Sequence, residues 1–243
     1  MNLLKNFLIG LAIITIIITI LIYIVKNNFN PDKYILNLKK GIYTISSAAK
    51  IVDAQENINF SMVNKPCSQK PSENVLSYQK KGISFCAIFN EALKGYIYYG
   101  KLISENKATL KYNIEETKTI NNSLKYYNIY QLADGIILGV PDAKKTTKCS
   151  INPEEPAPLE KECIGFLDVN GINPPNKEVT CKDGITNSLI QNIQEEEIPK
   201  CIPSLDKNHL TDIYPIAFHD NVIEFATTAG RQIYTTDRSS MVK

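Results

Sequence analysis

The chain has 243 residues, of which 44% are hydrophobic and 21% charged; this composition is close to that of ordinary globular proteins and excludes a largely disordered chain. Its 27 basic and 25 acidic residues nearly balance, whereas a nucleic-acid binder normally shows a concentrated basic face, so we expect no nucleic-acid partner. Two histidines are too few for a multi-histidine metal centre.

The first predicted element is a membrane-spanning helix over residues 7–25, which follows a short segment of residues 1–6. These 19 residues carry no charge, and a helix of that length spans about 28 Å, close to the hydrocarbon thickness of a bilayer. A cleaved secretory signal would have a shorter apolar region and a small-residue cleavage site, which residues 23–26 do not provide. We therefore expect a retained single-pass anchor.

An amphipathic helix is predicted over residues 31–57, within a segment 26–57 that leads from the membrane to the head. Asn30 is a suitable N-cap and Pro31 a suitable first helical residue. Apolar residues then recur at intervals of three and four, as on one helix face: Ile35, Leu38, Ile42, Ile45, Ala49 and Val52. This face either packs on the protein's own sheet or also packs against neighbouring subunits, and the periodicity slightly favours the first interpretation.

The remainder, residues 58–243, is predicted to be a β-rich head. Runs rich in β-branched and aromatic residues predict strands at residues 83–89, 96–103, 108–114, 126–132, 136–140 and 163–169, with one or two more in 214–234. Asp134-Gly135 predicts a hairpin turn, residues 90–95 a helical turn, 141–162 an exposed loop, and 186–197 a short helix. The predicted fold class is α+β: a long N-terminal helix, membrane-spanning and then amphipathic, packed on an antiparallel sheet with a disulfide-stapled C-terminal region.

Six cysteines all follow the apolar segment, and none belongs to a C-x-x-C motif. An even number on one side of a membrane indicates disulfides, and hence an oxidising compartment outside the cytoplasm. The lysines that follow the span favour the opposite orientation, but we give the cysteines more weight. Six cysteines allow 15 connectivities, of which we predict pairing between sequence neighbours: Cys67–Cys86, Cys149–Cys163 and Cys181–Cys201.

This arrangement resembles the type IV pilin and type II secretion pseudopilin family. The resemblance rests on the apolar segment, the helix that follows it (residues 38–48), the cysteine-containing β-rich head, and three C-terminal stretches at residues 132–135, 168–177 and 212–227. It implies a structural pilin-like subunit, a minor pseudopilin of a type II secretion or type IV pilus-type filament. Its partners would be membrane lipid and other pilin-like subunits, which it would contact through its N-terminal helix, and it would reside in the bacterial inner membrane with its head outside the cytoplasm.

Two family features differ at the N-terminus. The family's leader normally ends in Gly before a Phe, with Glu four positions after that Phe; around Phe7 the corresponding residues are Asn6 and Leu11. The missing Glu argues against a major subunit, while a minor subunit or an uncleaved membrane-anchored relative is compatible with it. The alternative function is a non-assembling, single-pass anchored binding or adhesion protein.

Several residues invite a chemical interpretation. His219-Asp220, His209 and Ser239-Ser240 could suggest a base and a nucleophile, but no G-x-S-x-G motif accompanies them. Asp168, Asn170 and Asn176 surround a Gly turn and could contribute to a calcium site, as similar loops do in some pseudopilins; their spacing departs from the usual calcium loop, and a turn is the simpler interpretation. We therefore expect no enzyme and assign no catalytic, cofactor-binding or metal-ligating residue. The aromatic clusters at Tyr96, Tyr98, Tyr99, Tyr126, Tyr127 and Tyr130 suggest one face of a sheet.

Overall fold

The computed structural model describes residues 10–11, 13–19, 31–68, 82–102, 110–115, 117–121, 123–152, 154, 159–182, 201–203 and 211–235. The predicted span at 7–25 lies partly outside these residues; its described parts, 10–11 and 13–19, are helical. Within the described part of the chain, no helix is both long and apolar enough to cross a membrane. The short helix predicted at 186–197 lies outside the described residues.

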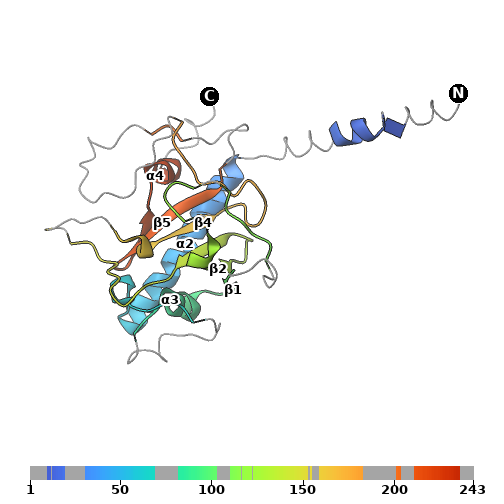
Figure 1. The fold of residues 1–243 in the computed structure, drawn as a ribbon. Helices are drawn as coiled ribbons and strands as arrows, with labels where there is room; N and C mark the ends of the chain where they lie inside the picture. The colour runs from blue at the N-terminus through green and yellow to red at the C-terminus, as the bar shows by residue number, and fades with distance from the viewer. Residues whose placement is uncertain are drawn as a thin grey trace, which may run out of the picture.

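A six-stranded antiparallel sheet forms the centre of the molecule, with its strands in chain order (Figure 1). The strands are β1 (Ile97–Lys101), β2 (Tyr127–Gln131), β3 (Ile137–Pro141), β4 (Ile164–Asp168), β5 (Ile213–His219) and β6 (Val222–Phe225). Each corresponds to a strand predicted from the sequence, and the α+β class is confirmed. The predicted hairpin joins β2 to β3, and Gly135 in its turn has a φ of 81°, a conformation that glycine adopts without strain.

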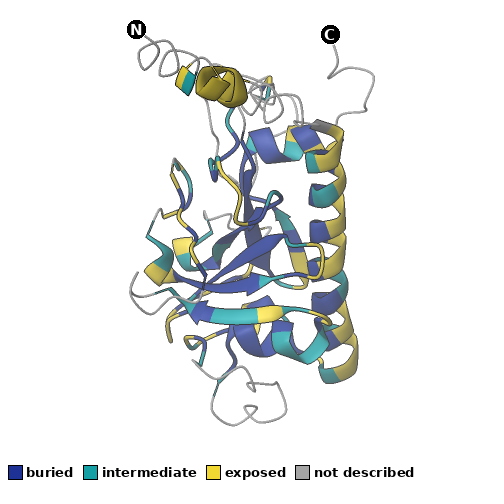
Figure 2. Ribbon diagram, turned by 90° about the vertical axis from the view of Figure 1, so that its right-hand side faces the viewer, coloured by how far each residue is buried: buried dark blue, intermediate teal, exposed yellow. Residues whose placement is uncertain are grey.

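The long helix α2 (Pro31–Glu56) lies along one side of the sheet. All six apolar positions of the predicted face are buried. Figure 2 shows the buried side of α2 turned toward the sheet and its exposed side turned outward. Gly41 belongs to the buried side, where a Cβ would lie 3.3 Å from Leu167 Cδ1, so the glycine allows helix and sheet to approach closely. The interpretation that this face packs on the protein's own sheet is confirmed.

Two predicted strands are wrong. Residues 83–89 belong mostly to a helix, α3 (Phe85–Ala92), and residues 110–114, the described part of the segment 108–114, form no strand. Five consecutive residues of α3 are buried, from Phe85 to Phe89, so the segment is apolar on every side and its periodicity does not distinguish helix from strand. A further helix, α4 (Thr228–Thr235), follows β6 within the region where only strands were predicted.

The sheet separates two hydrophobic cores because its side chains alternate between faces. Tyr130, Leu138 and Leu167 belong to the core shared with α2, α3 and α4. Ile129, Ile137 and Phe166 belong to the second core, which is covered by the irregular segment around Leu110, Tyr112, Ile114 and Ile120. The head is therefore layered as helices, sheet and irregular chain.

All three predicted disulfides are confirmed: Cys67–Cys86, Cys149–Cys163 and Cys181–Cys201. Three short 3-10 helices complete the described structure: η1 (Phe60–Met62), η2 (Leu124–Tyr126) and η3 (Lys161–Cys163). The Cys149–Cys163 bridge closes the loop predicted at 141–162 and places η3 directly before β4.

Candidate functional site: a lysine-lined cleft

A cleft of about 780 Å³ lies at the end of the sheet where β1 and β3 end and β2 and β4 begin. That size is typical of small-molecule sites. Its lining comes from six separate stretches of chain: Pro66, Lys101, Thr117–Asn121, Lys125–Tyr127, Pro141–Lys144 and then Lys161, Glu162 and Ile164.

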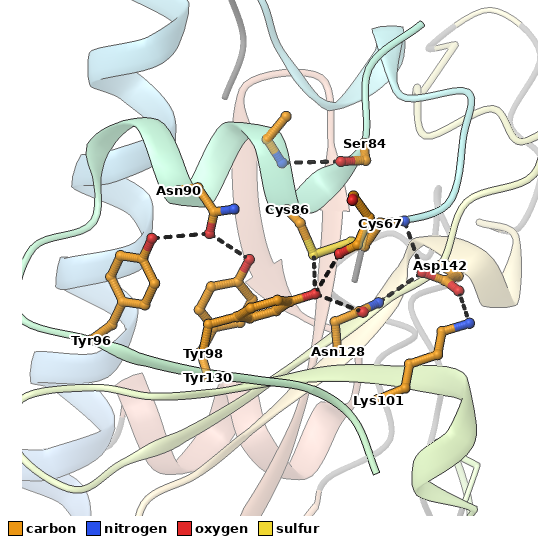
Figure 3. Close-up of a disulfide and its surroundings, with 12 residues drawn as sticks. Cys67, Ser84, Cys86, Asn90, Tyr96, Tyr98, Lys101, Asn128, Tyr130 and Asp142 are labelled. Carbon is orange, nitrogen blue, oxygen red and sulfur yellow. Dashed lines mark hydrogen bonds and ion pairs between the residues drawn. A yellow bond between two sulfur atoms is a disulfide. The ribbon is translucent and has the colours of Figure 1, made fainter. Parts of the chain in front are cut away.

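Asp142 organises one side of the cleft, and Figure 3 shows its contacts. Its Oδ1 accepts hydrogen bonds from the backbone N–H of Cys67 at 3.1 Å and from Nδ2 of Asn128 at 2.7 Å. Its Oδ2 forms an ion pair with Nζ of Lys101. Because these partners come from a disulfide-bonded loop and two strands, the carboxylate fixes the relative positions of three lining elements.

Behind Asp142 the polar contacts continue into the interior (Figure 3). The Tyr98 hydroxyl lies 3.1 Å from Oδ1 of Asn128, 3.0 Å from the Ser68 carbonyl, and 3.9 Å from Sγ of Cys86. Farther along, the hydroxyls of Tyr96 and Tyr130 both donate to Oδ1 of Asn90. This network links the cleft to the Cys67–Cys86 disulfide and to α3.

The tyrosines that the sequence groups together do not share one face of the sheet. Tyr96, Tyr98 and Tyr130 pack with the helices, whereas Tyr99 and Tyr127 pack in the second core. Tyr126 is half exposed and lines the cleft, with Nζ of Lys125 5.2 Å from its ring centroid.

Another part of the cleft lining is held by a buried carboxylate. Glu178 accepts hydrogen bonds from the successive backbone N–H groups of Lys118, Thr119 and Ile120, the shortest at 2.8 Å. Next along the chain, the Asn121 N–H donates to the Tyr127 hydroxyl at 3.0 Å. Burial raises the pKa of Tyr127 to about 12, so the phenol stays neutral at physiological pH. Hydrogen bonds from successive backbone N–H groups to the side chains of Glu178 and Tyr127 therefore hold this part of the lining in place.

Positive charge predominates in the lining, which contains five lysines and two carboxylates. Lys101 pairs with Asp142 and Lys144 with Glu162. The hydrogen bond from Lys144 lowers the pKa of Glu162, so both members of that pair are charged at neutral pH. The lining therefore has an excess of cationic side chains, which suits an anion.

His219 lies elsewhere, at the turn between β5 and β6. Its Nδ1 is 3.2 Å from Oδ2 of Asp220, and its Nε2 is 3.0 Å from Oε1 of Glu224. The nearby hydroxyl, that of Ser150, donates to Asp220 at 2.8 Å. Both imidazole nitrogens thus contact carboxylates. The Ser150 hydroxyl bonds to Asp220 and not to the imidazole, so this arrangement does not activate the serine as a nucleophile. His209, Ser239 and Ser240 lie outside the described residues.

Asp168 is part of a buried acidic pair, whose other member the sequence analysis did not single out. Burial, together with the nearby Asp212 carboxylate, raises the pKa of Asp168 well above its usual range, and burial raises that of Asp212 to about 6. The Tyr112 hydroxyl donates to Asp168 at 2.8 Å, and the N–H groups of Asn176 and Lys177 donate to Asp212.

Asn170 and Asn176 form a turn beside this pair. The Asn170 side chain donates to the carbonyls of Asn173 and Pro174, and Asn176 contributes its N–H to Asp212. Across the described segments, no three acidic, histidine or cysteine side chains gather as metal ligands. The three residues considered for calcium thus lie in one region of the fold.

No motif in the sequence marks the cleft. The lysines at 144 and 145 follow a predicted strand, but nothing in the sequence indicates that Lys101, Lys125 and Lys161 meet there. No protein-family model, curated protein or solved structure matches the chain.

Proposed function

We propose that the protein is a membrane-anchored, pilin-like structural subunit, of the minor pseudopilin kind, in a type II secretion or type IV pilus-type filament. The apolar segment at 7–25 anchors it in the bacterial inner membrane, and the disulfide-bonded head lies outside the cytoplasm. Neighbouring subunits pack against its N-terminal helix.

The observation that carries this proposal is the division of α2 into two faces. One face is buried on the sheet over the length of the helix, while the other exposes three large apolar side chains: Leu36 (50%), Tyr43 (75%) and Ile51 (45%). Spacings of seven and eight residues place these three on one side of a helix. The stripe follows the apolar segment in sequence, and the exposed side of α2 would offer it to a neighbour.

Site-directed cross-linking tests the assembly. Tyr43→Cys places a thiol on the exposed stripe, and we expect a bismaleimide reagent to capture adducts heavier than the monomer in membranes of cells that make the protein naturally. Ile42→Cys, one position away but only 8% exposed and turned toward the sheet, should give no adduct. Ile97→Cys on β1, 55% exposed, controls for accessibility and random collision.

If Tyr43→Cys stays monomeric while a small maleimide labels it, the filament proposal is wrong. That outcome would favour the second candidate function, a non-assembling anchored binding protein. The specific observation behind this alternative is the cleft, because a purely structural subunit has no need of a preorganised, lysine-rich concavity.

A further inference from the structure

We propose that the cleft at the end of the sheet binds a small acidic saccharide, of one or two sugar units, that carries a carboxylate or phosphate group. This inference goes beyond the structural role and holds whether or not the subunits assemble.

The charge of the lining calls for an anion. Lysines make up five of its 17 residues, against 25 lysines in the 243-residue chain, and the chain as a whole has a net charge of only +2. Two of them, Lys101 and Lys144, are paired with the two lining carboxylates, so cations remain in excess, and Lys125 on η2 and Lys161 on η3 come from separate elements. An anion held in the cleft would thus face cations from several sides, where each ammonium acts as a point charge without a fixed bonding plane.

The remaining lining is suited to a sugar. Tyr126 presents a half-exposed aromatic ring, a surface that is apolar on its face and polar at its tip. Thr117, Thr119 and Asn121 supply hydroxyl and amide groups that can both donate and accept hydrogen bonds. The Tyr126 ring can pack on the C–H face of a pyranose, and the hydroxyl and amide groups can bond to its hydroxyls. The lysines can pair with its acidic substituent, so the lining as a whole suits an acidic saccharide.

The cleft is also preorganised. Asp142 fixes one side through Cys67, Asn128 and Lys101, and Glu178 fixes another part of the lining through three backbone N–H groups. A site that is already ordered loses little freedom on binding, which favours affinity.

Single-stranded nucleic acid is a poorer fit. Such ligands are held by several aromatic side chains on which successive bases stack, along a charged groove. Of the two tyrosines in the described lining, Tyr127 is buried and only Tyr126 is exposed, and the lining contains no arginine.

The test uses the full-length chain in a neutral detergent, titrated by calorimetry. The probes are a galacturonic acid disaccharide, the matching uncharged galactose disaccharide, galactose 6-phosphate and a single-stranded thymidine octanucleotide. We expect the carboxylated or the phosphorylated sugar to bind, and whichever binds more tightly identifies the acidic group. The neutral disaccharide should bind at least tenfold more weakly.

Three variants locate the site. The double variant Lys125→Gln/Lys161→Gln removes two exposed cations and should weaken binding about tenfold. Tyr126→Ala, made separately, should weaken binding by more than the double variant does. Lys50→Gln, on the exposed side of α2, is the matched control and should bind as the parent chain does. Unchanged circular dichroism in each variant excludes unfolding as the cause.

The proposal is overturned if neither acidic sugar binds, if the neutral disaccharide binds equally well, or if the double lysine variant binds as tightly as the parent chain. Tighter binding of the octanucleotide than of either acidic sugar also overturns it, and assigns the cleft to nucleic acid. None of these results bears on the cross-linking of Tyr43→Cys, so the two proposals fail separately.

Discussion

At the scale of single residues, packing in the second core depends on one glycine. Gly139 on β3 is paired with Phe166 on β4, and a Cβ at this position would overlap the phenylalanine ring. That ring in turn contacts Tyr127 edge-on, with ring centroids 5.0 Å apart, and stacks on Tyr112. The glycine thus lets an aromatic ring lie flat on the sheet beneath the irregular segment.

Gly139→Ala should therefore destabilise the head. The alanine methyl group forces Phe166 out of its position, and overpacking of this kind costs about 1–3 kcal/mol. Urea unfolding of the full-length chain in neutral detergent, followed by far-UV circular dichroism, measures the change.

Gly41→Ala is the matched control for this substitution. There the new methyl group lies 3.3 Å from the end of the Leu167 side chain and in ordinary contact with Ile136 at 3.5 Å, and alanine gains about 1 kcal/mol in helix propensity. We expect it to stay within about 1 kcal/mol of the parent chain. Equal stabilities of the Gly139→Ala variant and the parent would contradict the argument.

At the scale of elements, the sequence predicts the long helix by its period and the strands by their composition. The 3-and-4 spacing of α2 is recovered because one side of the helix faces the sheet and the other is exposed. The strands β2 to β5 are largely buried on both faces, and they are recovered from their β-branched and aromatic residues and from the Asp134-Gly135 turn. The first five residues of α3 are all buried, so their composition favours strand and helix alike. Only Ser84, immediately before the helix, is a local signal for its start.

The candidate site is less predictable than the fold for a physical reason. Its lysines lie on five stretches of chain that meet only when the strand ends are aligned, and its rigidity comes from Asp142 and Glu178, whose partners are distant in sequence. Disulfide pairing was predictable, by contrast, since each bridge joins cysteines that are neighbours in sequence.

Ser84→Ala tests the start of α3. The Ser84 hydroxyl accepts a hydrogen bond from the Ala87 N–H at 3.0 Å in a fully buried setting. Removing this N-cap should lower the free energy of unfolding by about 1–2 kcal/mol, measured by the same urea titration.

Ser61→Ala on η1 serves as the comparison, because its hydroxyl bonds to Asn59 at an exposed position. Its effect should be within about 0.5 kcal/mol of the parent chain. Were the two serine variants equally stable, the capping role of Ser84 would be refuted.

At the scale of the whole molecule, buried titratable groups make the free energy of unfolding depend on pH. Burial raises the pKa of Asp212 from 3.8 to about 6 and also raises that of Asp168. Between the unfolded and the folded pKa values, the folded protein therefore binds more protons than the unfolded chain. Its stability falls as the pH rises through that interval. His219 acts in the same direction. Its burial lowers its pKa, but its hydrogen bonds to Glu224 and Asp220 outweigh this effect and leave the pKa raised.

The stability that His219 contributes is fully present below pH 6.5 and is lost as pH rises through its folded pKa. The pKa values of Asp220 and Glu162 are lowered, so their contributions are present above about pH 4.5 and are lost only in more acidic solution. Between pH 5 and pH 8, the groups with a raised pKa (Asp168, Asp212 and His219) therefore determine how the free energy of unfolding changes with pH.

We expect the free energy of unfolding to be higher at pH 5 than at pH 8, by urea titration at intervals of one pH unit in a nonionic detergent. Asp212→Asn should flatten the part of the slope below pH 7. It removes one titrating group, and it leaves burial to raise the pKa of Asp168 without the added repulsion of the Asp212 carboxylate. His219→Gln should flatten the part above pH 6.5. Asp134→Asn, at an exposed carboxylate in the β2–β3 turn, should leave the profile unchanged. Two results would contradict this prediction: a parent chain that is more stable at pH 8 than at pH 5, or an Asp212→Asn variant whose stability changes with pH as much as the parent's. Either would show that the buried acids are ionised in the folded protein without cost.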